Sequence, residues 1–215
     1  EGRAVARERL EADLWPEMPP ARAANNLRVA LSRLRDVLEP RRLRDRREVL
    51  IALEDRSVAL TPAALAAWDV LGARAALDEI ARATHAADRT GVLSAAERYR
   101  TLHTGPFLPE AYDDWVIEYR RSFESETGER LRRLAETWLE RDEGSGPARV
   151  LARLALARDG ADERAWEVFV GAGLAAGDRT AAARAYAEAV RALARELDAE
   201  PGERLRALGE RAGAC

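Results

Sequence analysis

The segment RAANNLRVALSRLRDVLEP, residues 22–40, combines side chains that can read base pairs in duplex DNA. Arginine can donate two hydrogen bonds to guanine, asparagine can pair in the same way with adenine, and a small apolar group can contact the thymine methyl. On a helical wheel, residues of these kinds gather on one side. We predict that the following five face base edges in the major groove: Arg22, Asn25, Val29, Ser32 and Arg33.

The opposite side of the same helix is apolar. Leu27, Leu31, Leu34 and Leu38 fall within one narrow arc, so we expect all four to pack inward. Basic and polar residues beside the reading face, and those that follow it, would set the position on DNA by contacting phosphates. We expect this backbone set to be Asn26, Arg28, Arg35, Arg44, Arg46, Arg47 and Arg56. The alternative is that this polar face is simply solvated, and the neighbouring elements decide between the two interpretations.

Charge is distributed unevenly along the chain. The 215 residues carry a net charge of −3, yet residues 22–47 hold nine arginines against three acidic residues. From residue 61 onward, 22 arginines are outnumbered by 27 acidic residues. A basic N-terminal part joined to an acidic remainder favours a nucleic-acid partner for the first part only.

The sequence gives little support for catalysis, metal binding or membrane insertion. His85 and His103 have no serine or carboxylate at catalytic spacing, and with the single Cys215 they form no zinc pattern. We therefore predict no enzyme activity, no metal and no cofactor. No apolar run reaches the roughly 18 residues of a membrane span, and no charged leader followed by an apolar stretch opens the chain. We expect a cytoplasmic protein without a membrane partner.

The elements around the basic helix suggest how it is held. Val5–Trp15 predicts a short amphipathic helix that stops at Pro16, and residues 21–39 predict the basic helix. Two β-prone runs follow, 48–53 and 57–61, with a polar turn at 54–56 that indicates a hairpin. Helix, loop, basic helix and hairpin in this order predict a winged helix-turn-helix over residues 1–62.

This part of the sequence resembles the DNA-binding half of the SARP-type antibiotic regulatory activators. The resemblance rests on RERLEADLWPE, NNLRVALSRLR and REVLIALEDRSVALTP, and covers residues 3 to about 70. It implies a response-regulator-type winged helix with NNLRVALSRLR as recognition helix. Members of this family carry a small β-sheet and a helix ahead of this point, so we expect the winged helix here to be partial. The resemblance also implies binding to direct repeats near a promoter and activation of a secondary-metabolite gene cluster.

The remainder, residues 63–215, predicts an all-α domain of tetratricopeptide-like repeats. With Trp166 at the fourth position of a 34-residue repeat, Gly177 falls at the turn between two helices. Ala182, Tyr186 and Ala189 then take the small, aromatic and small positions of the second helix. A step back of 34 residues gives Ala148 and Ala155, and a looser copy includes Ala95 and Tyr99. Between the copies, residues 112–140 predict one long helix, and ERDEGSGPARV predicts a flexible loop.

This second half resembles the bacterial transcriptional activator domain of the same regulators. The matching segments are GPFLPEAYDDW, DERAWEVFVGAGLAAGDRTAAARAYAEAVRALARELDAEP and ERLRAL. The resemblance implies a homodimer on DNA and contacts with RNA polymerase. The alternative is a protein-interaction module in which the acidic repeats bind a peptide and the winged helix has lost its function. The predicted fold is thus mainly α, a partial winged helix-turn-helix followed by helical repeats.

Overall fold

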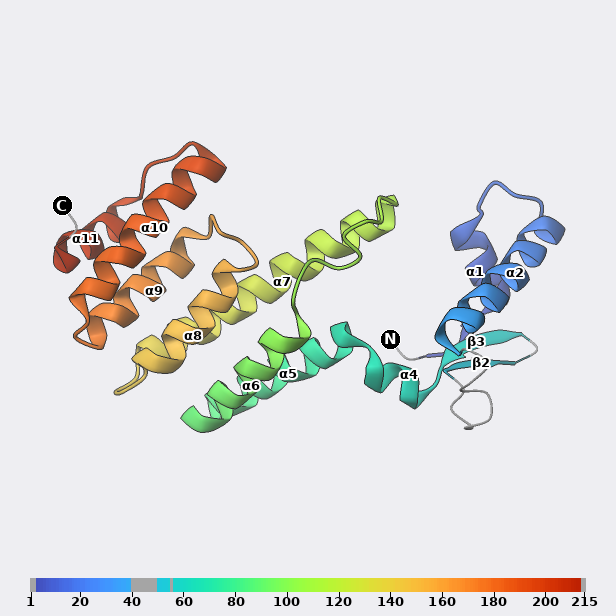
Figure 1. Cartoon of the computed structure of the whole chain (residues 1–215), viewed down its shortest axis with the longest axis horizontal. Helices are drawn as coiled ribbons and strands as arrows, with labels where there is room; N and C mark the ends of the chain where they lie inside the picture. Colours follow the sequence, from blue (N-terminus) through green and yellow to red (C-terminus); the bar gives the residue numbers. More distant parts are fainter. Residues whose placement is uncertain (1–2, 40–49, 55, 214–215) are drawn as a thin grey trace. The chain divides into compact units, whose positions relative to one another are not determined.

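The structure, a computed structural model, describes residues 3–39, 50–54 and 56–213 (Figure 1). The chain divides into two compact units, Glu1–Gly72 and Ala73–Cys215. We call them the N-terminal unit and the helical unit and describe each by itself.

The N-terminal unit contains the predicted basic helix. Strand β1 (Val5–Ala6) leads directly into α1 (Arg7–Leu14), and α2 (Pro20–Leu38) follows after a short loop. Pro20 opens α2 at a position where its missing N–H costs nothing, because the first helical N–H groups have no intrahelical partner. Ala23, Leu27 and Leu31 form the buried side of α2, which packs against α1.

The predicted hairpin is confirmed and belongs to a three-stranded antiparallel sheet. Strands β2 (Ile51–Leu53) and β3 (Ser57–Leu60) pair with Ile51 opposite Leu60, and β1 adds to the other edge of β3 with Val5 opposite Val58. The prediction that Val5 begins a helix was therefore wrong. Residues 5–6 are extended because β3 supplies backbone partners that a local amphipathic pattern cannot reveal. The short helix α4 (Pro62–Ala67) follows, capped by Thr61.

The predicted inward arc of α2 holds for only part of its length. Leu27 and Leu31 are buried, whereas the exposed fractions of Leu34 and Leu38 are 45% and 39%. At about 1.5 Å per residue, the eight residues of α1 span less than half the length of the 19-residue α2. The short α1 cannot pack along the whole of α2, and the buried apolar side of α2 ends at Leu31.

A buried carboxylate joins the end of α2 to the sheet. Glu39 is 4% exposed, and its Oε1 accepts hydrogen bonds from the backbone N–H groups of Leu50 (2.7 Å) and Ile51 (2.9 Å). Its Oε2 accepts from Arg35 Nε at 3.0 Å. Burial alone would raise the pKa of Glu39, but the hydrogen bonds from Ile51, Arg35 and Leu50 outweigh burial and hold this pKa below its usual value. Glu39 thus ties α2 to β2 as an ionised group.

The helical unit is built from antiparallel helix pairs, as predicted (Figure 1). The pairs and the final helix have these bounds: α5 (Asp69–His85) with α6 (Arg89–Leu102), α7 (Asp114–Leu139) with α8 (Ser145–Leu156), α9 (Glu163–Ala175) with α10 (Arg179–Leu197), and α11 (Glu203–Ala212). One hydrophobic cluster runs through these helices from Ala73 to Ala212. None of the helices in the described ranges is both long and apolar enough to cross a membrane.

The small residues of the predicted repeat lie where the paired helices approach each other. Ala148, Ala182 and Ala189 are fully buried, and a Cβ added to Gly173 would lie 3.2 Å from the Cβ of Ala182. Ala95 and Tyr99 of the looser copy are equally buried. The 34-residue register taken from Trp166 therefore gives the correct helix contacts, because close approach requires small side chains at these points.

Two connections between helices differ in how they are held. The prediction of a flexible loop over ERDEGSGPARV is wrong for the second half of this segment, because Ser145, Gly146 and Pro147 form the first turn of α8.

The longer connection, residues 103–113, is closed by one side chain. Arg120 on α7 donates to the carbonyl groups of Phe107 (2.6 Å), Leu108 and Ala111 (3.0 Å).

Candidate nucleic-acid interface

The side of α2 that faces away from its buried residues carries the predicted base-reading set. Arg22, Asn25, Ser32 and Arg33 are exposed, and Val29 is 37% exposed. All five belong to one regular helix that is anchored by Ala23, Leu27 and Leu31 on its other side. The helix therefore presents them together on a rigid element, which is the arrangement that major-groove reading requires.

Several residues predicted at the DNA backbone are already engaged within α2 or the loop before it. Arg28 Nη2 donates to Asn25 Oδ1 at 2.9 Å, which orients both side chains along the helix. Arg35 is bonded to Glu39. Asn26 is half-buried and donates to the sulfur of Met18 at 3.2 Å, so its amide points toward the loop that precedes α2. Arg56 is exposed beside the hairpin, and Arg44, Arg46 and Arg47 lie outside the described residues.

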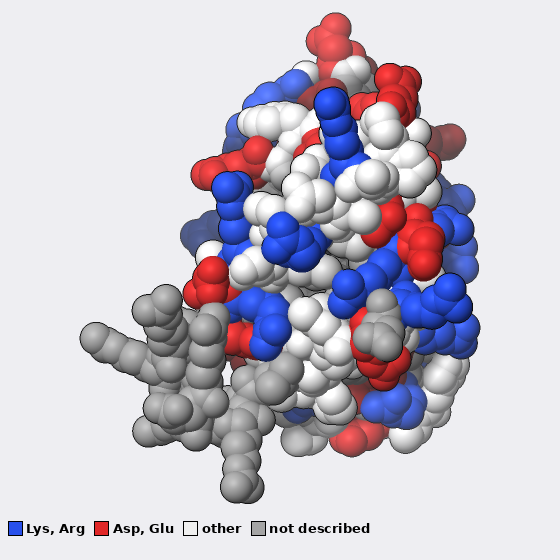
Figure 2. Space-filling model, turned by 90° about the vertical axis from the view of Figure 1, so that its right-hand side faces the viewer, with Lys and Arg blue, Asp and Glu red and all other residues white. Residues whose placement is uncertain are grey.

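Sequence reasoning missed Arg7 as a functional candidate. Its side chain borders a depression of about 410 Å³ in the N-terminal unit. The lining residues are Arg7, Arg28, Leu31, Ser32, Arg35, Asp36 and Leu53. The sequence predicts only a short amphipathic helix over Val5–Trp15, and the packing of α1 on α2 brings Arg7 into the same lining as Arg28 and Arg35. Figure 2 views the side of the molecule that carries α1 and α2, and shows arginine side chains (blue) interspersed with uncharged surface and acidic groups.

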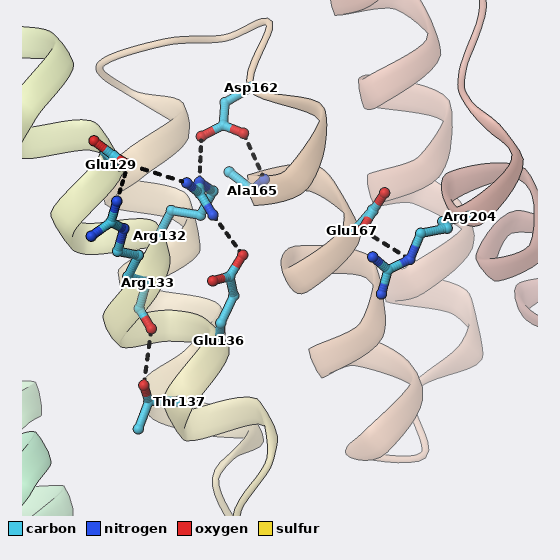
Figure 3. Close-up of polar contacts among 9 residues, drawn as sticks. All are labelled: Glu129, Arg132, Arg133, Glu136, Thr137, Asp162, Ala165, Glu167 and Arg204. Atoms are coloured by element: carbon cyan, nitrogen blue, oxygen red, sulfur yellow. Dashed lines mark hydrogen bonds and ion pairs between the residues drawn. The ribbon is translucent and has the colours of Figure 1, made fainter.

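The helical unit has a second hollow, a groove of about 790 Å³ between α7, α9 and α11. Its lining combines apolar residues such as Leu139, Val168 and Leu208 with charged residues from all three helices. Figure 3 shows the ion pair of Glu167 on α9 with Arg204 on α11, in which the closest nitrogen and oxygen are 3.8 Å apart. Burial raises the pKa of Glu167, and the nearby Arg204 offsets part of this effect.

Beside this groove, Arg132 on α7 connects two helices. Its guanidinium contacts Glu136 on the same helix at 2.6 Å and Asp162, the N-cap residue of α9, at 3.3 Å (Figure 3). The Asp162 carboxylate also accepts the Ala165 N–H at 3.0 Å. Of the pairs in Figure 3, Arg132 with Asp162 links α7 to α9 and Glu167 with Arg204 links α9 to α11, whereas the others lie within one helix.

His103 is the C-cap residue of α6 and lies in a buried network. Its Nε2 is 3.0 Å from Glu124 Oε1 and its Nδ1 is 2.5 Å from the hydroxyl of Tyr99. Burial raises the pKa of Tyr99, so its hydroxyl stays protonated, and each ring nitrogen of His103 has one polar partner. Among the residues that the structure describes, no group of three or more histidine, cysteine or acidic side chains could hold a metal ion.

Comparisons with known proteins agree with this architecture. Residues 68–212 match the family model described as "Bacterial transcriptional activator domain". A similar solved structure is Mycobacterium tuberculosis EmbR in complex with a low-affinity phosphopeptide, with a TM-score of 0.64 and 21% sequence identity. The match covers 99% of this chain and 55% of that chain, so the chain spans about half the length of EmbR. No curated protein is significantly similar in sequence.

The two halves therefore have different kinds of support. The family match covers the helical unit, and the likeness to EmbR extends the same fold through the winged-helix elements ahead of it. The family is one of transcription regulators and not a class of enzymes. The predicted resemblance to the SARP-type activators is confirmed. The chain belongs to the bacterial transcriptional activator domain family, the family of the SARP-type transcription regulators.

Proposed function

We propose that the protein is a sequence-specific DNA-binding transcriptional activator whose reading element is α2. The observation that carries this proposal is the division of α2 into a side anchored by Ala23, Leu27 and Leu31 and an exposed side rich in arginine, asparagine and serine. The base-facing residues are Arg22, Asn25, Val29, Ser32 and Arg33. The backbone set is Asn26, Arg28, Arg35, Arg44, Arg46, Arg47 and Arg56.

The division of labour follows from the chemistry of each group. Exposed arginine and asparagine on a rigid helix can make paired hydrogen bonds to a base edge, which discriminates between bases. Arg56, next to β3, is placed to neutralise phosphate charge without reading sequence. The helical unit holds two copies on direct repeats near a promoter and contacts RNA polymerase, in the cytoplasm, to activate a biosynthetic gene cluster.

The test is a selection of bound sequences from a random double-stranded DNA library with the full-length protein. We expect enrichment of a short motif repeated head-to-tail at about one helical turn, 10–10.5 base pairs. The matched control is a variant with Arg22, Asn25 and Arg33 all replaced by alanine, which should bind weakly and enrich no motif. If the parent protein enriches no sequence at low salt, the proposal is wrong.

The groove between α7, α9 and α11 favours a second candidate, a peptide-binding module. Its lining of apolar residues with a few charged groups is typical of a surface that binds a ligand or a partner chain. Salt dependence separates the two functions. Several phosphate contacts make log affinity fall with log salt at a slope near −0.9 per contact, whereas binding in an apolar groove responds weakly.

A further inference from the structure

We propose that the depression between α1, α2 and β2 binds one phosphate group of the DNA backbone, with Arg7 as a principal ligand. This inference rests on the proposed DNA-binding function and adds to it a residue and a position. The depression lies wholly within the N-terminal unit and is lined by residues of α1, α2 and β2.

The charge of the lining suits a phosphate. Three of its side chains are guanidinium groups, from Arg7, Arg28 and Arg35, and one is a carboxylate, from Asp36. Arg28 uses Nη2 to bond Asn25 and Arg35 uses Nε to bond Glu39. Since a guanidinium has five N–H groups, both arginines keep donors for an anion. Three guanidinium groups against the one carboxylate of Asp36 leave the lining with a net positive charge.

Arg7 itself has a donor that the described residues leave unused. Its Nε is buried and has no hydrogen-bond partner among them. A buried donor without a partner is unfavourable, so a turn of the Arg7 side chain that brought Nε to a phosphate oxygen would be favoured. The backbone of Arg7 is fixed, because its N–H donates to the carbonyl group of Arg56 at 2.9 Å and Ala6 pairs with Ser57 in the sheet. The starting point of the Arg7 side chain is therefore fixed beside the depression.

The start of α1 adds to the attraction. Arg7 is the first residue of this helix, and the N-cap residue Ala6 makes no side-chain hydrogen bond to the first turn. Glu8 in the first turn offsets part of the helix dipole, but no capping side chain occupies the first N–H groups, which can attract an anion beside Arg7.

The depression also borders the proposed reading face. Ser32 belongs to both, and Arg28 lies one turn before it on α2. A phosphate held here would sit beside the bases that Ser32 and its neighbours read. It would thus fix how α2 enters the groove, which is the usual role of backbone contacts.

The first experiment compares Arg7→Gln with Arg9→Gln in the full-length protein. Arg9 lies on the same helix, is highly exposed, and pairs with Asp13 at 2.8 Å, so its substitution removes the same charge without touching the depression. We expect Arg7→Gln to weaken binding to the selected duplex roughly tenfold or more, and to make the salt slope less negative by about 0.9, the value for one phosphate contact. Arg9→Gln should leave the slope unchanged. Equal effects of the two substitutions would overturn the proposal.

The second experiment locates the phosphate. Each phosphate of the duplex is replaced in turn by an uncharged methylphosphonate. At one position in each half-site, the methylphosphonate should lower the affinity of the parent protein. At that same position it should leave the affinity of Arg7→Gln unchanged. If the two proteins respond alike at every position, the phosphate site is wrong although DNA binding stands. If the parent protein binds no duplex, the proposed function itself fails.

Folding is checked by thermal unfolding of both variants. If Arg7→Gln unfolds at a lower temperature than the parent protein, Arg7→Lys takes its place in the methylphosphonate series. This variant keeps the positive charge but lacks the forked N–H groups. At the same position, the methylphosphonate should lower the affinity of Arg7→Lys less than that of the parent protein. An equal loss of affinity would contradict the role of Arg7 as a phosphate ligand.

Discussion

The two units bury very different amounts of apolar side chain. In the helical unit, buried residues from Ala73 to Ala212 form one cluster through successive helix pairs. In the described part of the N-terminal unit, the buried apolar residues are Ala23, Leu27, Leu31, Ile51 and Val70. The helical unit therefore draws its stability from repeated packing, whereas the N-terminal unit depends more on a few contacts and on polar links such as Glu39.

This difference matches the two proposed tasks. A repeat array gains stability from each added neighbour and can serve as a scaffold. A reading helix has to expose one whole side, so it can bury little, and α2 keeps only three residues inside. Four experiments test this difference between the two units.

Leu27→Ala should have the largest effect. Leu27 is 4% exposed at the centre of the small core, and its truncation should lower the free energy of unfolding of the N-terminal unit by roughly 2–5 kcal/mol. The control is Leu34→Ala, at a residue that is 45% exposed, which should cost far less. Urea unfolding followed by NMR should show signals of the N-terminal unit lost earlier while those of the helical unit stay in place. Loss of both sets together would show that the two units are not independent.

Ala182→Leu tests the helical unit in the same way. Ala182 is fully buried against Gly173, so a larger side chain forces α9 and α10 apart, at a cost of typically 1–3 kcal/mol. Ala194→Leu, at an exposed position of α10, is the matched control. Calorimetric melting of both variants is the measurement. An unchanged melting temperature for Ala182→Leu would show that Ala182 does not pack closely against Gly173.

Arg33→Ala tests the exposed face of α2 rather than either core. If Arg33 reads guanine, its loss should weaken binding to the selected sequence by about 1–3 kcal/mol and relax base preference at one position. Thermal stability should not change, because Arg33 is exposed. Competition assays with single-base variants of the site give the measurement. Equal loss on every sequence would reassign Arg33 to a phosphate contact.

Acidification should have the smallest effect on the free energy of unfolding. The sign of the change should be opposite in the two units. The pKa of Glu39 is lowered in the folded protein, so its stabilising contribution is present above the ordinary value of 4.5 and is lost as pH falls through the lower folded value. Burial raises the pKa of Asp162 and of Glu167, so these groups favour folding more as pH falls. The N-terminal unit should therefore lose stability first.

The amide signals of Leu50 and Ile51 report on this directly, because both N–H groups donate to Glu39. Their NMR shifts should titrate with a midpoint below 4.5. A midpoint above 4.5 would mean that burial outweighs the hydrogen bonds.

Much of the fold could be predicted because its signals are local. A 34-residue repeat read from Trp166 predicted the buried Ala148, Ala182 and Ala189, since each small residue marks a contact with the adjacent helix. The hairpin was predicted from two β-prone runs and the turn between them. The exposed set on α2 followed from helical periodicity alone.

The features that were missed depend on contacts between distant residues. The strand Val5–Ala6 exists only because β3 pairs with it, and Arg7 becomes part of a hollow through the packing of α1 on α2. Glu39 looked like the end of a helix, yet its partners Leu50 and Ile51 lie 11 and 12 positions away. Leu34 and Leu38 fit the apolar arc, but periodicity does not say how long the neighbouring helix is.

The hydrogen bonds from Arg120 to three carbonyl groups bear on how such a repeat array can change in evolution. Ala95 and Ala148 are 53 positions apart instead of 34, because α7 has 26 residues where α9 has 13, and because the connection between α6 and α7 is also longer. The entropy lost on closing a loop rises only slowly with its length, so extra residues cost little there. One guanidinium that binds three carbonyl groups restores the order of the longer segment. A longer connection between helix pairs can thus be held in place by a single arginine.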